Sequence, residues 1–307
     1  MAVETPVKVL YIAGFERSGS TLLTKVAGEL EHTFAAAELR GIWHRSFQTN
    51  QECGCGQGFR ECDLWQEIIA DAYGGYDNVD WQRMIDLRPK RRHTPLLLMP
   101  GSQPVIARMF REYIATLDQL YRSIATVTDS RVIVDSSKTP LYAAVLGLAP
   151  SVDLRVLLLI RNPHGVQSSN LRRARDGDRM LGTLDTYSVS RSLLEWDALH
   201  ATQELLGLRQ RKRYMRMRYE DFVADPVASI EQIKQFLDEP DIGIPRFKDG
   251  TVYLSPNHTV CGNRNRIETG AVPLRLDERW RTDLDADTRT LVRRLTLPLL
   301  HRYGYAG

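Results

Sequence analysis

The segment YIAGFERSGSTLL, residues 11–23, has the residue types and the spacing of a loop that binds an anion. Four residues separate Gly14 from Gly19, and Ser20 and Thr21 follow directly, as in a phosphate-binding loop. A nucleoside triphosphatase places a lysine after the second glycine, but Ser20 stands in that position here. Backbone N–H groups, hydroxyls and Arg17 therefore remain to hold an anionic group other than the β- and γ-phosphates of a triphosphate.

A second anion-binding pattern lies in LLLIRNPHGVQSSNLRR, residues 157–173. Arg161 ends an apolar segment, and Ser169 follows eight residues later in a segment with helical character. A guanidinium at a strand end and a hydroxyl near a helix N-terminus can share one phosphate dianion. Arg173 lies about one helical turn beyond Ser169 and is a third candidate ligand.

The elements that must position these residues alternate between strand and helix. The apolar and β-rich segments predict strands at residues 7–13, 33–38, 131–137, 154–161 and 213–221. The periodicity of the remaining segments predicts helices at residues 20–30, 104–127, 139–148, 163–175, 183–208, 226–237 and 285–302. This alternation is typical of a three-layer α/β fold of the P-loop type, in which helices cover a central parallel sheet and ligands bind at the carboxyl ends of the strands.

We expect residues 1–307 to form one domain with two irregular parts. Residues 39–103 contain Gly-, Cys- and Pro-rich stretches that break the alternation, and they predict an insertion of loops and helices beside the site. Residues 243–307 are irregular until the last predicted helix.

Composition excludes several classes of protein. The chain of 307 residues carries a net charge of +3, and 43% of its residues are hydrophobic, as in an ordinary globular protein. The near-neutral charge gives no support for nucleic acid as a partner. The strongest apolar run, residues 154–160, is much shorter than the about 18 residues of a membrane span. Because the N-terminal residues read as a strand and not as a leader, we expect a soluble, cytoplasmic protein.

Four segments together resemble the sulfotransferases that use 3′-phosphoadenosine 5′-phosphosulfate (PAPS). RSGSTLL at 17–23 resembles the family's 5′-phosphosulfate loop, and residues 157–173 are similar to its 3′-phosphate site. MRYEDFVADP at 217–226 resembles the strand end whose tyrosine contacts adenine, and CGNRNR at 261–266 resembles a basic loop that closes over the 3′-phosphate in bacterial members. The matches occur in order over nearly the whole chain, and they explain the absent lysine because PAPS has no γ-phosphate.

The resemblance implies which residues bind PAPS and its product PAP, the 3′-phosphate-5′-phosphate nucleotide. They belong to the 5′-loop, the 3′-site, the adenine contact and the basic loop: Arg17, Ser18, Gly19, Ser20, Thr21, Arg161, Ser169, Arg173, Tyr219, Asn263, Arg264 and Arg266. It also implies that residues 39–103 form the acceptor side and that residues 243–307 close on the nucleotide.

Transfer of a sulfonate to a hydroxyl requires a base for the proton and cations for the developing charge. Glu38, which is 21 residues after Arg17, resembles the catalytic glutamate of the protein-tyrosine sulfotransferase branch, and Lys138 in VDSSKTP resembles its active-site lysine. We therefore expect Glu38 to be the general base and Arg17 and Lys138 to stabilise the sulfonate. Many cytosolic members use a histidine near the DSSK position, where this chain has none. His44 and Asp135 remain rival bases, and Asp135 can instead orient Lys138.

The predicted function is transfer of the sulfonate of PAPS to a hydroxyl of a small molecule, a glycan or a glycolipid, with no metal required; the oligomeric state stays open. The alternative is a small-molecule kinase with a degenerate phosphate loop, in which Asp135 would be the Mg²⁺ ligand. A third hypothesis is a nucleotide-binding module without catalysis. Three aromatic residues between 39 and 103 favour an acceptor with an apolar or ring face, although such residues are usually core: Trp43, Phe47 and Trp65.

The cysteines form an unusual cluster. Cys53, Cys55 and Cys62 lie in CGCGQGFREC, and Cys261 is far along the chain. This spacing is not that of a regular zinc finger, so we expect reduced thiols first, a disulfide second and zinc third, and we assign no metal ligand.

Overall fold

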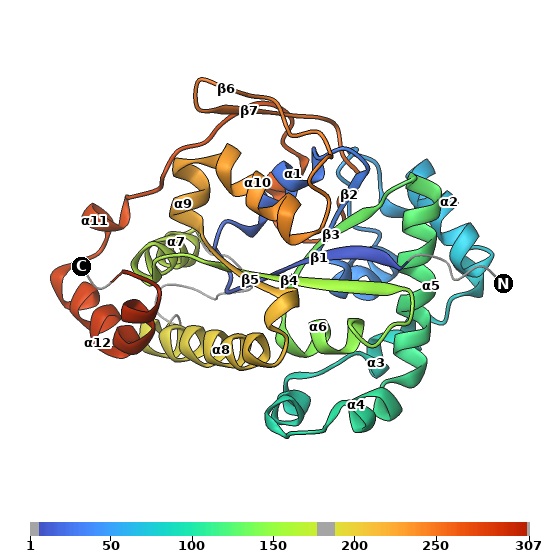
Figure 1. The fold of residues 1–307 in the computed structure, drawn as a ribbon, viewed down its shortest axis with the longest axis horizontal. Helices are drawn as coiled ribbons and strands as arrows, with labels where there is room; N and C mark the ends of the chain where they lie inside the picture. The colour runs from blue at the N-terminus through green and yellow to red at the C-terminus, as the bar shows by residue number, and fades with distance from the viewer. Residues whose placement is uncertain (1–5, 177–187, 306–307) are drawn as a thin grey trace.

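A five-stranded parallel sheet forms the centre of the fold (Figure 1). The computed structural model describes residues 6–176 and 188–305. The strands follow the order β2-β3-β1-β4-β5, with β1 (Val7–Ala13), β2 (Thr33–Ala37), β3 (Val132–Lys138), β4 (Val152–Ile160) and β5 (Tyr214–Arg218). Because β1 pairs with β3 on one side and β4 on the other, the loop after β1 lies at the switch point where such sheets bind ligands.

Two hydrophobic cores lie on the two faces of this sheet. Val9 and Tyr11 of β1 belong to one core, whereas Leu10 and Ile12 belong to the other, because successive side chains of a strand point to opposite faces. All four are fully buried, which explains why the strand reads as a nearly continuous apolar run.

Helices cover both faces of the sheet and complete the three layers (Figure 1). One face is covered by α1 (Ser20–Gly28), α9 (Tyr219–Ala224) and α10 (Pro226–Phe236). The other face is covered by α5 (Arg111–Thr128), α6 (Pro140–Leu146), α7 (Pro163–Arg175) and α8 (Val189–Arg209), with α12 (Ala286–Arg302) against α8. The expected three-layer α/β fold with a central parallel sheet is confirmed.

The segment from 39 to 103 is built mainly of short helices. It contains η1 (Leu39–Gly41), the π-helix η2 (Ile42–Gln48), η3 (Phe59–Glu61), α2 (Asp63–Tyr73), η4 (Tyr76–Asn78), α3 (Trp81–Leu87) and η5 (Arg91–Leu98), and α4 (Gln103–Met109) follows. Trp43, Phe47 and Trp65 are at most 1% exposed and pack in the core under this segment. They are therefore structural side chains and give no information about an acceptor.

The region after residue 243 contains elements that the sequence did not reveal. A small antiparallel sheet of the order β6-β7-β8 comprises β6 (Phe247–Lys248), β7 (Thr251–Leu254) and β8 (Gly270–Pro273). Between and after its strands lie η7 (Arg264–Ile267) and α11 (Trp280–Asp283). Val252, Leu254 and Val272 bury this sheet against the core on the α1 side. Strands of two to four residues are too short to show a period in the sequence.

Most predicted boundaries are confirmed within a few residues, with two differences. The helix predicted at 104–127 is divided at Phe110 into α4 and α5. The strand predicted at 213–221 is β5, which follows the short turn η6 (Arg211–Arg213) and ends at Arg218, where α9 begins. Residues 183–187 of the helix predicted at 183–208 lie outside the described residues. Among the residues that the structure describes, no helix has both the length and the apolar character needed to cross a membrane.

Candidate active site

Each of the five parallel strands ends at a residue or loop that the sequence marks as functional. The loop with Arg17 follows β1, Glu38 follows β2, Lys138 ends β3, Arg161 follows β4 and Tyr219 follows β5. Parallel strands present their carboxyl ends at one edge of the sheet, so the topology gathers all five there. The strand order puts Glu38 and Lys138 on one side of the central loop and Arg161 and Tyr219 on the other.

The loop after β1 fits tightly between its neighbours. Gly14 has φ +140°, and a Cβ atom there would lie 2.4 Å from the carbonyl oxygen of Leu159 in β4. Gly19 has φ +90° and precedes α1, and its Cβ would lie 2.3 Å from the ring of Tyr219. Only glycine is compatible with this backbone and these contacts.

The hydroxyls of this loop surround the N-terminus of α1, where helix N–H groups attract anions. Ser20 is the first residue of α1 and is buried, and Thr21 is half-buried beside it. Ser18 is 1% exposed, and within residues 6–176 and 188–305 its Oγ has no hydrogen-bond partner. The loop therefore offers a buried hydroxyl and a helix terminus to an anion.

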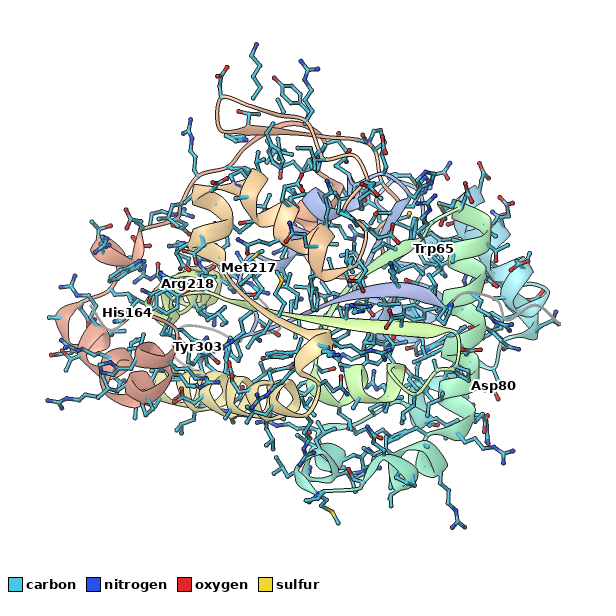
Figure 2. All side chains as sticks on the ribbon, viewed as in Figure 1. Trp65, Asp80, His164, Met217, Arg218 and Tyr303 are labelled. Carbon is cyan, nitrogen blue, oxygen red and sulfur yellow. The ribbon has the colours of Figure 1, made fainter. Side chains whose placement is uncertain are left out.

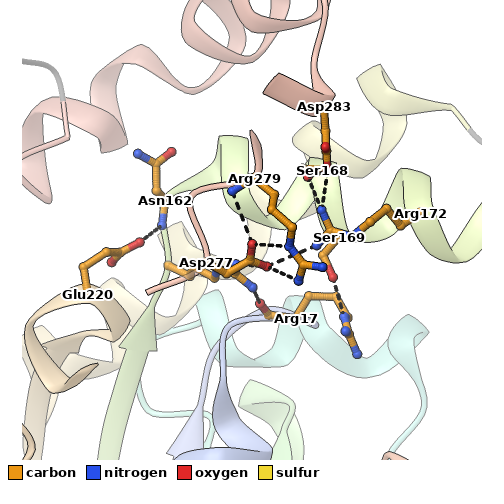
Figure 3. Close-up of polar contacts among 10 residues, drawn as sticks. Arg17, Asn162, Ser168, Ser169, Arg172, Glu220, Asp277, Arg279 and Asp283 are labelled. Carbon is orange, nitrogen blue, oxygen red and sulfur yellow. Dashed lines mark hydrogen bonds and ion pairs between the residues drawn. The ribbon is translucent and has the colours of Figure 1, made fainter. Parts of the chain in front are cut away.

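The two predicted phosphate sites meet in space (Figure 3). Arg17 Nε donates a hydrogen bond of 2.8 Å to Ser169 Oγ, and Arg161 Nη1 donates one of 2.9 Å to the carbonyl oxygen of Arg17. The guanidinium of Arg161 also lies 4.9 Å from the centre of the Tyr219 ring. The residues predicted from three separate motifs therefore form one site.

Positive charge is concentrated around Arg17. Its burial, followed by repulsion from Arg173, Arg161 and Arg172, lowers the pKa of the Arg17 guanidinium. Such a group of like charges attracts an anion strongly. The sequence predicted Arg173, about one helical turn after Ser169, and not Arg172.

Two carboxylates from the segment before α12 cover this group of arginines. Asp277 accepts hydrogen bonds of 3.1 Å from Arg161, 3.1 Å from Arg172 and 2.7 Å from Arg279 (Figure 3). Asp283 pairs with Arg172 and accepts a hydrogen bond of 3.0 Å from Ser168. Partial burial alone would raise the pKa of Asp277, but the hydrogen bonds and charges of Arg279 and Arg161 hold that pKa well below its usual range.

The described side chains of the loop at residues 261–266 form contacts within the loop and with Glu52. Asn263 accepts a hydrogen bond of 3.2 Å from the backbone N–H of Asn265, and the buried Arg266 donates to the carbonyl oxygen of Glu52. The side chain of Arg264 lies outside the described residues. Asp277, which pairs with Arg279, is a C-terminal residue that contacts Arg161, and the assignment of Asn263 and Arg266 to the nucleotide stays a prediction.

Glu38 and Lys138 form an ion pair at the other half of the site. The side chain of Glu38 is 27% exposed, and Arg45 Nη1 lies 3.9 Å from its second carboxylate oxygen. Burial would raise the pKa of Glu38, but the charge and hydrogen bond of Lys138, with the charge of Arg45, lower it below the ordinary value. Glu38 is consequently a carboxylate at neutral pH, which is the form that accepts a proton.

Backbone strain marks the same strand ends. Arg17, Ala37 and Lys138 have φ values of 64°, 67° and 67°, in the left-handed region that residues other than glycine rarely adopt. Strain of this kind persists only where surrounding contacts hold it, and it is concentrated at functional sites.

The two rival bases occupy different surroundings. Asp135 is fully buried and accepts hydrogen bonds from Tyr121 and from the N–H and Oγ of Ser137. Ser137 Oγ in turn accepts a hydrogen bond of 3.0 Å from the N–H of Arg40, so Asp135 supports the turns that carry Glu38 and Lys138. His44 is exposed on η2, where its ring contacts Gln48.

Comparison with known proteins gives a consistent result. A family model described as “Sulfotransferase family” matches residues 10–242. The chain is similar to a sulfotransferase domain from the curacin biosynthetic pathway, with a TM-score of 0.53, 19% identity, and coverage of 96% of this chain and 98% of that chain. A sulfotransferase domain from the olefin synthase of Synechococcus PCC 7002 has a TM-score of 0.53, 17% identity, and coverage of 96% and 97%. No curated protein matches.

Asp135→Asn is expected to change how stability depends on pH. Burial raises the pKa of Asp135 from 3.8 to about 6, although Ser137 and Tyr121 donate hydrogen bonds to it. Its contribution to stability is therefore complete below pH 3.8 and is lost as the pH rises through 6. Relative to the variant, the wild type should lose about 2 kcal/mol of unfolding free energy between about pH 4.5 and pH 7. Urea denaturation at both pH values measures this, and a difference that is independent of pH would contradict it.

Proposed function

The chain belongs to the sulfotransferase family, and we propose that this sulfotransferase takes its sulfonate from PAPS and transfers it to a hydroxyl group of an acceptor. One observation carries the proposal: Arg17, Arg161 and Ser169 meet beside a phosphate loop that has no lysine. A kinase requires a cation for the β- and γ-phosphates in that loop and has no use for a second phosphate site next to it. PAPS carries phosphate groups at the 3′ and the 5′ positions of its ribose, so it requires both sites.

The donor occupies the half of the site formed by β1, β4 and β5. We assign the 5′-phosphosulfate to the N–H groups and hydroxyls of residues 14–21, at the positive end of α1. The 3′-phosphate is assigned to Arg161 and Ser169, and Arg173 contributes positive charge nearby. Adenine is assigned to Tyr219, since this ring already lies against Gly19 and under the Arg161 guanidinium.

The acceptor occupies the half formed by β2 and β3. Glu38 accepts the proton of the acceptor hydroxyl, whose oxygen forms a bond to sulfur while the bond from sulfur to the 5′-phosphate oxygen breaks. PAP leaves with the electrons of that bond, and the sulfonate remains on the acceptor. Lys138 and Arg17 stabilise the charge on the sulfonate and on the leaving oxygen. These fixed cations supply the charge that the transfer needs, so the proposed reaction uses no metal ion.

The C-terminal segment serves both halves in this proposal, within one domain of residues 1–307. Gly262 lies against Glu38, because a Cβ atom there would be 3.4 Å from the Glu38 carboxyl carbon. Asp277, in the same segment, lies on Arg161. Residues 39–103 begin directly after Glu38 and form the acceptor side.

Calorimetric titration with PAP, and separately with ATP and Mg²⁺, tests the donor. PAP should bind, and Arg161→Ala should weaken binding by at least about 30-fold, since truncating one member of a buried charge pair costs about 2 kcal/mol or more. Arg246→Ala is the control, because this arginine stacks on Tyr253 of β7, in the separate antiparallel sheet. Binding of ATP with Mg²⁺ but not of PAP would favour the kinase alternative.

Glu38→Gln should keep PAP binding and lower the turnover number by about 10²- to 10⁴-fold, the usual contribution of a general base. The amide retains the shape of the side chain but cannot accept the proton. Glu67→Gln, on the exposed face of α2, is the matched control and should have normal turnover. Turnover is measured as release of PAP in the presence of an acceptor found by screening. Normal turnover in Glu38→Gln would assign the base to another residue.

Asp277→Asn should tighten PAP binding by about 10-fold, or about 1.4 kcal/mol, because the carboxylate competes with the 3′-phosphate for Arg161 and Arg172. Glu278→Gln makes the same change of charge one residue further along, where the carboxylate pairs with Arg281, and should leave the affinity unchanged. Weaker binding in Asp277→Asn would mean that this carboxylate orients Arg161 for the nucleotide.

A further inference from the structure

Four side chains that take no part in the proposed transfer converge on one point. The ligand atoms of Cys53, Cys55, Cys62 and His258 all lie within 4.8 Å of one another. His258 Nδ1 is 3.2 Å from Cys62 Sγ and 3.8 Å from Cys53 Sγ. Tetrahedral zinc with bonds of about 2.0–2.3 Å requires separations of about 3.5–3.8 Å between its ligand atoms. We propose that these three thiolates and one imidazole bind a structural zinc ion.

The backbone around Cys53 and Cys55 brings their side chains close together. Glu52 and Gly58 form an antiparallel bridge, and within it the N–H of Cys53 donates to the carbonyl of Gln57 at 2.7 Å. The N–H of Gly56 donates to the carbonyl of Cys53 at 3.0 Å, and Gly56 has φ +88°. This tight turn brings Cys55 back beside Cys53.

Cys62 lies at the N-terminal end of a helix. It is buried and directly precedes α2, so the positive N-terminus of the helix favours its thiolate form. Cys53 and Cys62 are both buried, where a thiolate is unfavourable without a nearby cation, and zinc supplies that cation.

The fourth ligand, His258, is 196 residues from Cys62 in the sequence, and hydrogen bonds to the backbone of His258 and of its neighbour hold it in place. The indole N–H of Trp65, a residue of α2 labelled in Figure 2, donates a hydrogen bond of 2.8 Å to the carbonyl oxygen of His258. Between the first two cysteines, the N–H of Gly54 donates to the carbonyl of Thr259 at 2.9 Å. A Cβ atom on Gly54 would lie 2.0 Å from Asn257 Oδ1, so this approach requires glycine.

His258, and not Cys261, is the fourth member of the cluster. The Sγ atom of Cys261 lies 3.6 Å from Ser46 Oγ and is not part of the cluster. Three sulfur ligands and one imidazole are the donor set and number of a closed, structural zinc site. All four positions of the ion are filled by the protein, so the ion has no position for a substrate.

The ion would join two segments next to the proposed base. Residues 257–260 run beside β2, where the N–H of Val260 donates to the carbonyl of Ala36 at 3.1 Å and the N–H of Glu38 donates to the carbonyl of Val260 at 3.3 Å. Zinc bound by Cys53, Cys55, Cys62 and His258 thus fixes the segment that pairs with the backbone of Glu38. Its role is to stabilise the fold around the acceptor half.

Metal analysis of the complete chain, purified without chelators, tests the proposal. Plasma mass spectrometry should find about one zinc ion per chain. Cys62→Ser and His258→Ala should each lower the bound zinc by about 10-fold or more, consistent with loss of one ligand from a closed site. Cys261→Ser is the matched control, because it removes a buried thiol outside the cluster, and it should retain zinc.

A second measurement keeps the test decisive if the ligand variants fail to fold. After removal of zinc from the wild type by a chelator, Co²⁺ should give the charge-transfer and d–d absorption of a tetrahedral thiolate site, and zinc should displace it. His258→Cys should keep one metal ion and shift the spectrum toward four sulfur ligands. Folded, reduced protein that contains no zinc and binds neither ion would overturn the proposal, as would a disulfide between two of the three cysteines. Neither readout depends on sulfonate transfer, so the outcome is separate from that of the proposed function.

Discussion

The balance of charge at the carboxyl edge of the sheet is the constraint on which the rest of the structure depends. The topology gathers the guanidiniums around Arg17 there, and their mutual repulsion opposes folding unless negative charge lies close by. In the described structure the carboxylates of Asp277 and Asp283 supply this charge to the donor half, and Glu38 supplies it to Lys138 in the acceptor half. Each half therefore holds an internal ion pair that a substrate group would replace under the proposed function, so binding would exchange one favourable contact for another.

The same edge explains how backbone geometry and electrostatics support each other. Arg17, Ala37 and Lys138 adopt left-handed backbone conformations, which turn the chain sharply as it leaves three neighbouring strands. Sharp turns shorten the distance between side chains that would otherwise diverge, and this is why Glu38 reaches Lys138. Buried Asp135 supports these turns, because it accepts a hydrogen bond from Ser137, which in turn accepts one from the backbone N–H of Arg40. The cost of the strained backbone is met by contacts in the core, as is usual at sites that bind or react.

The sequence predicted the strand ends well because each motif follows an apolar run long enough to show its period. Arg161, Glu38 and Lys138 could be placed at the edge of the sheet on this basis, whereas Tyr219 was assigned through the family resemblance, inside a strand predicted to extend to residue 221. The C-terminal segment could not be predicted in this way. Its strands are two to four residues long, and both the loop with Arg266 and the segment with Arg279 contain arginines, so composition did not show which one covers Arg161. A lone histidine such as His258 carries no spacing signal when its partners are 196 residues away.

The C-terminal segment contacts residues far earlier in the chain, and this affects the order in which the site forms during synthesis. Contacts between residues far apart in sequence form late, since the loop between them must close first. A chain that leaves the ribosome from its N-terminus can complete the five-stranded sheet once β5 has emerged, whereas His258 and Asp277 emerge only later. The arginines thus become available before their internal carboxylate partner. During this interval of synthesis a nascent chain exposes the arginines around Arg17, and Asp277 and Asp283 pair with them once their segment has emerged.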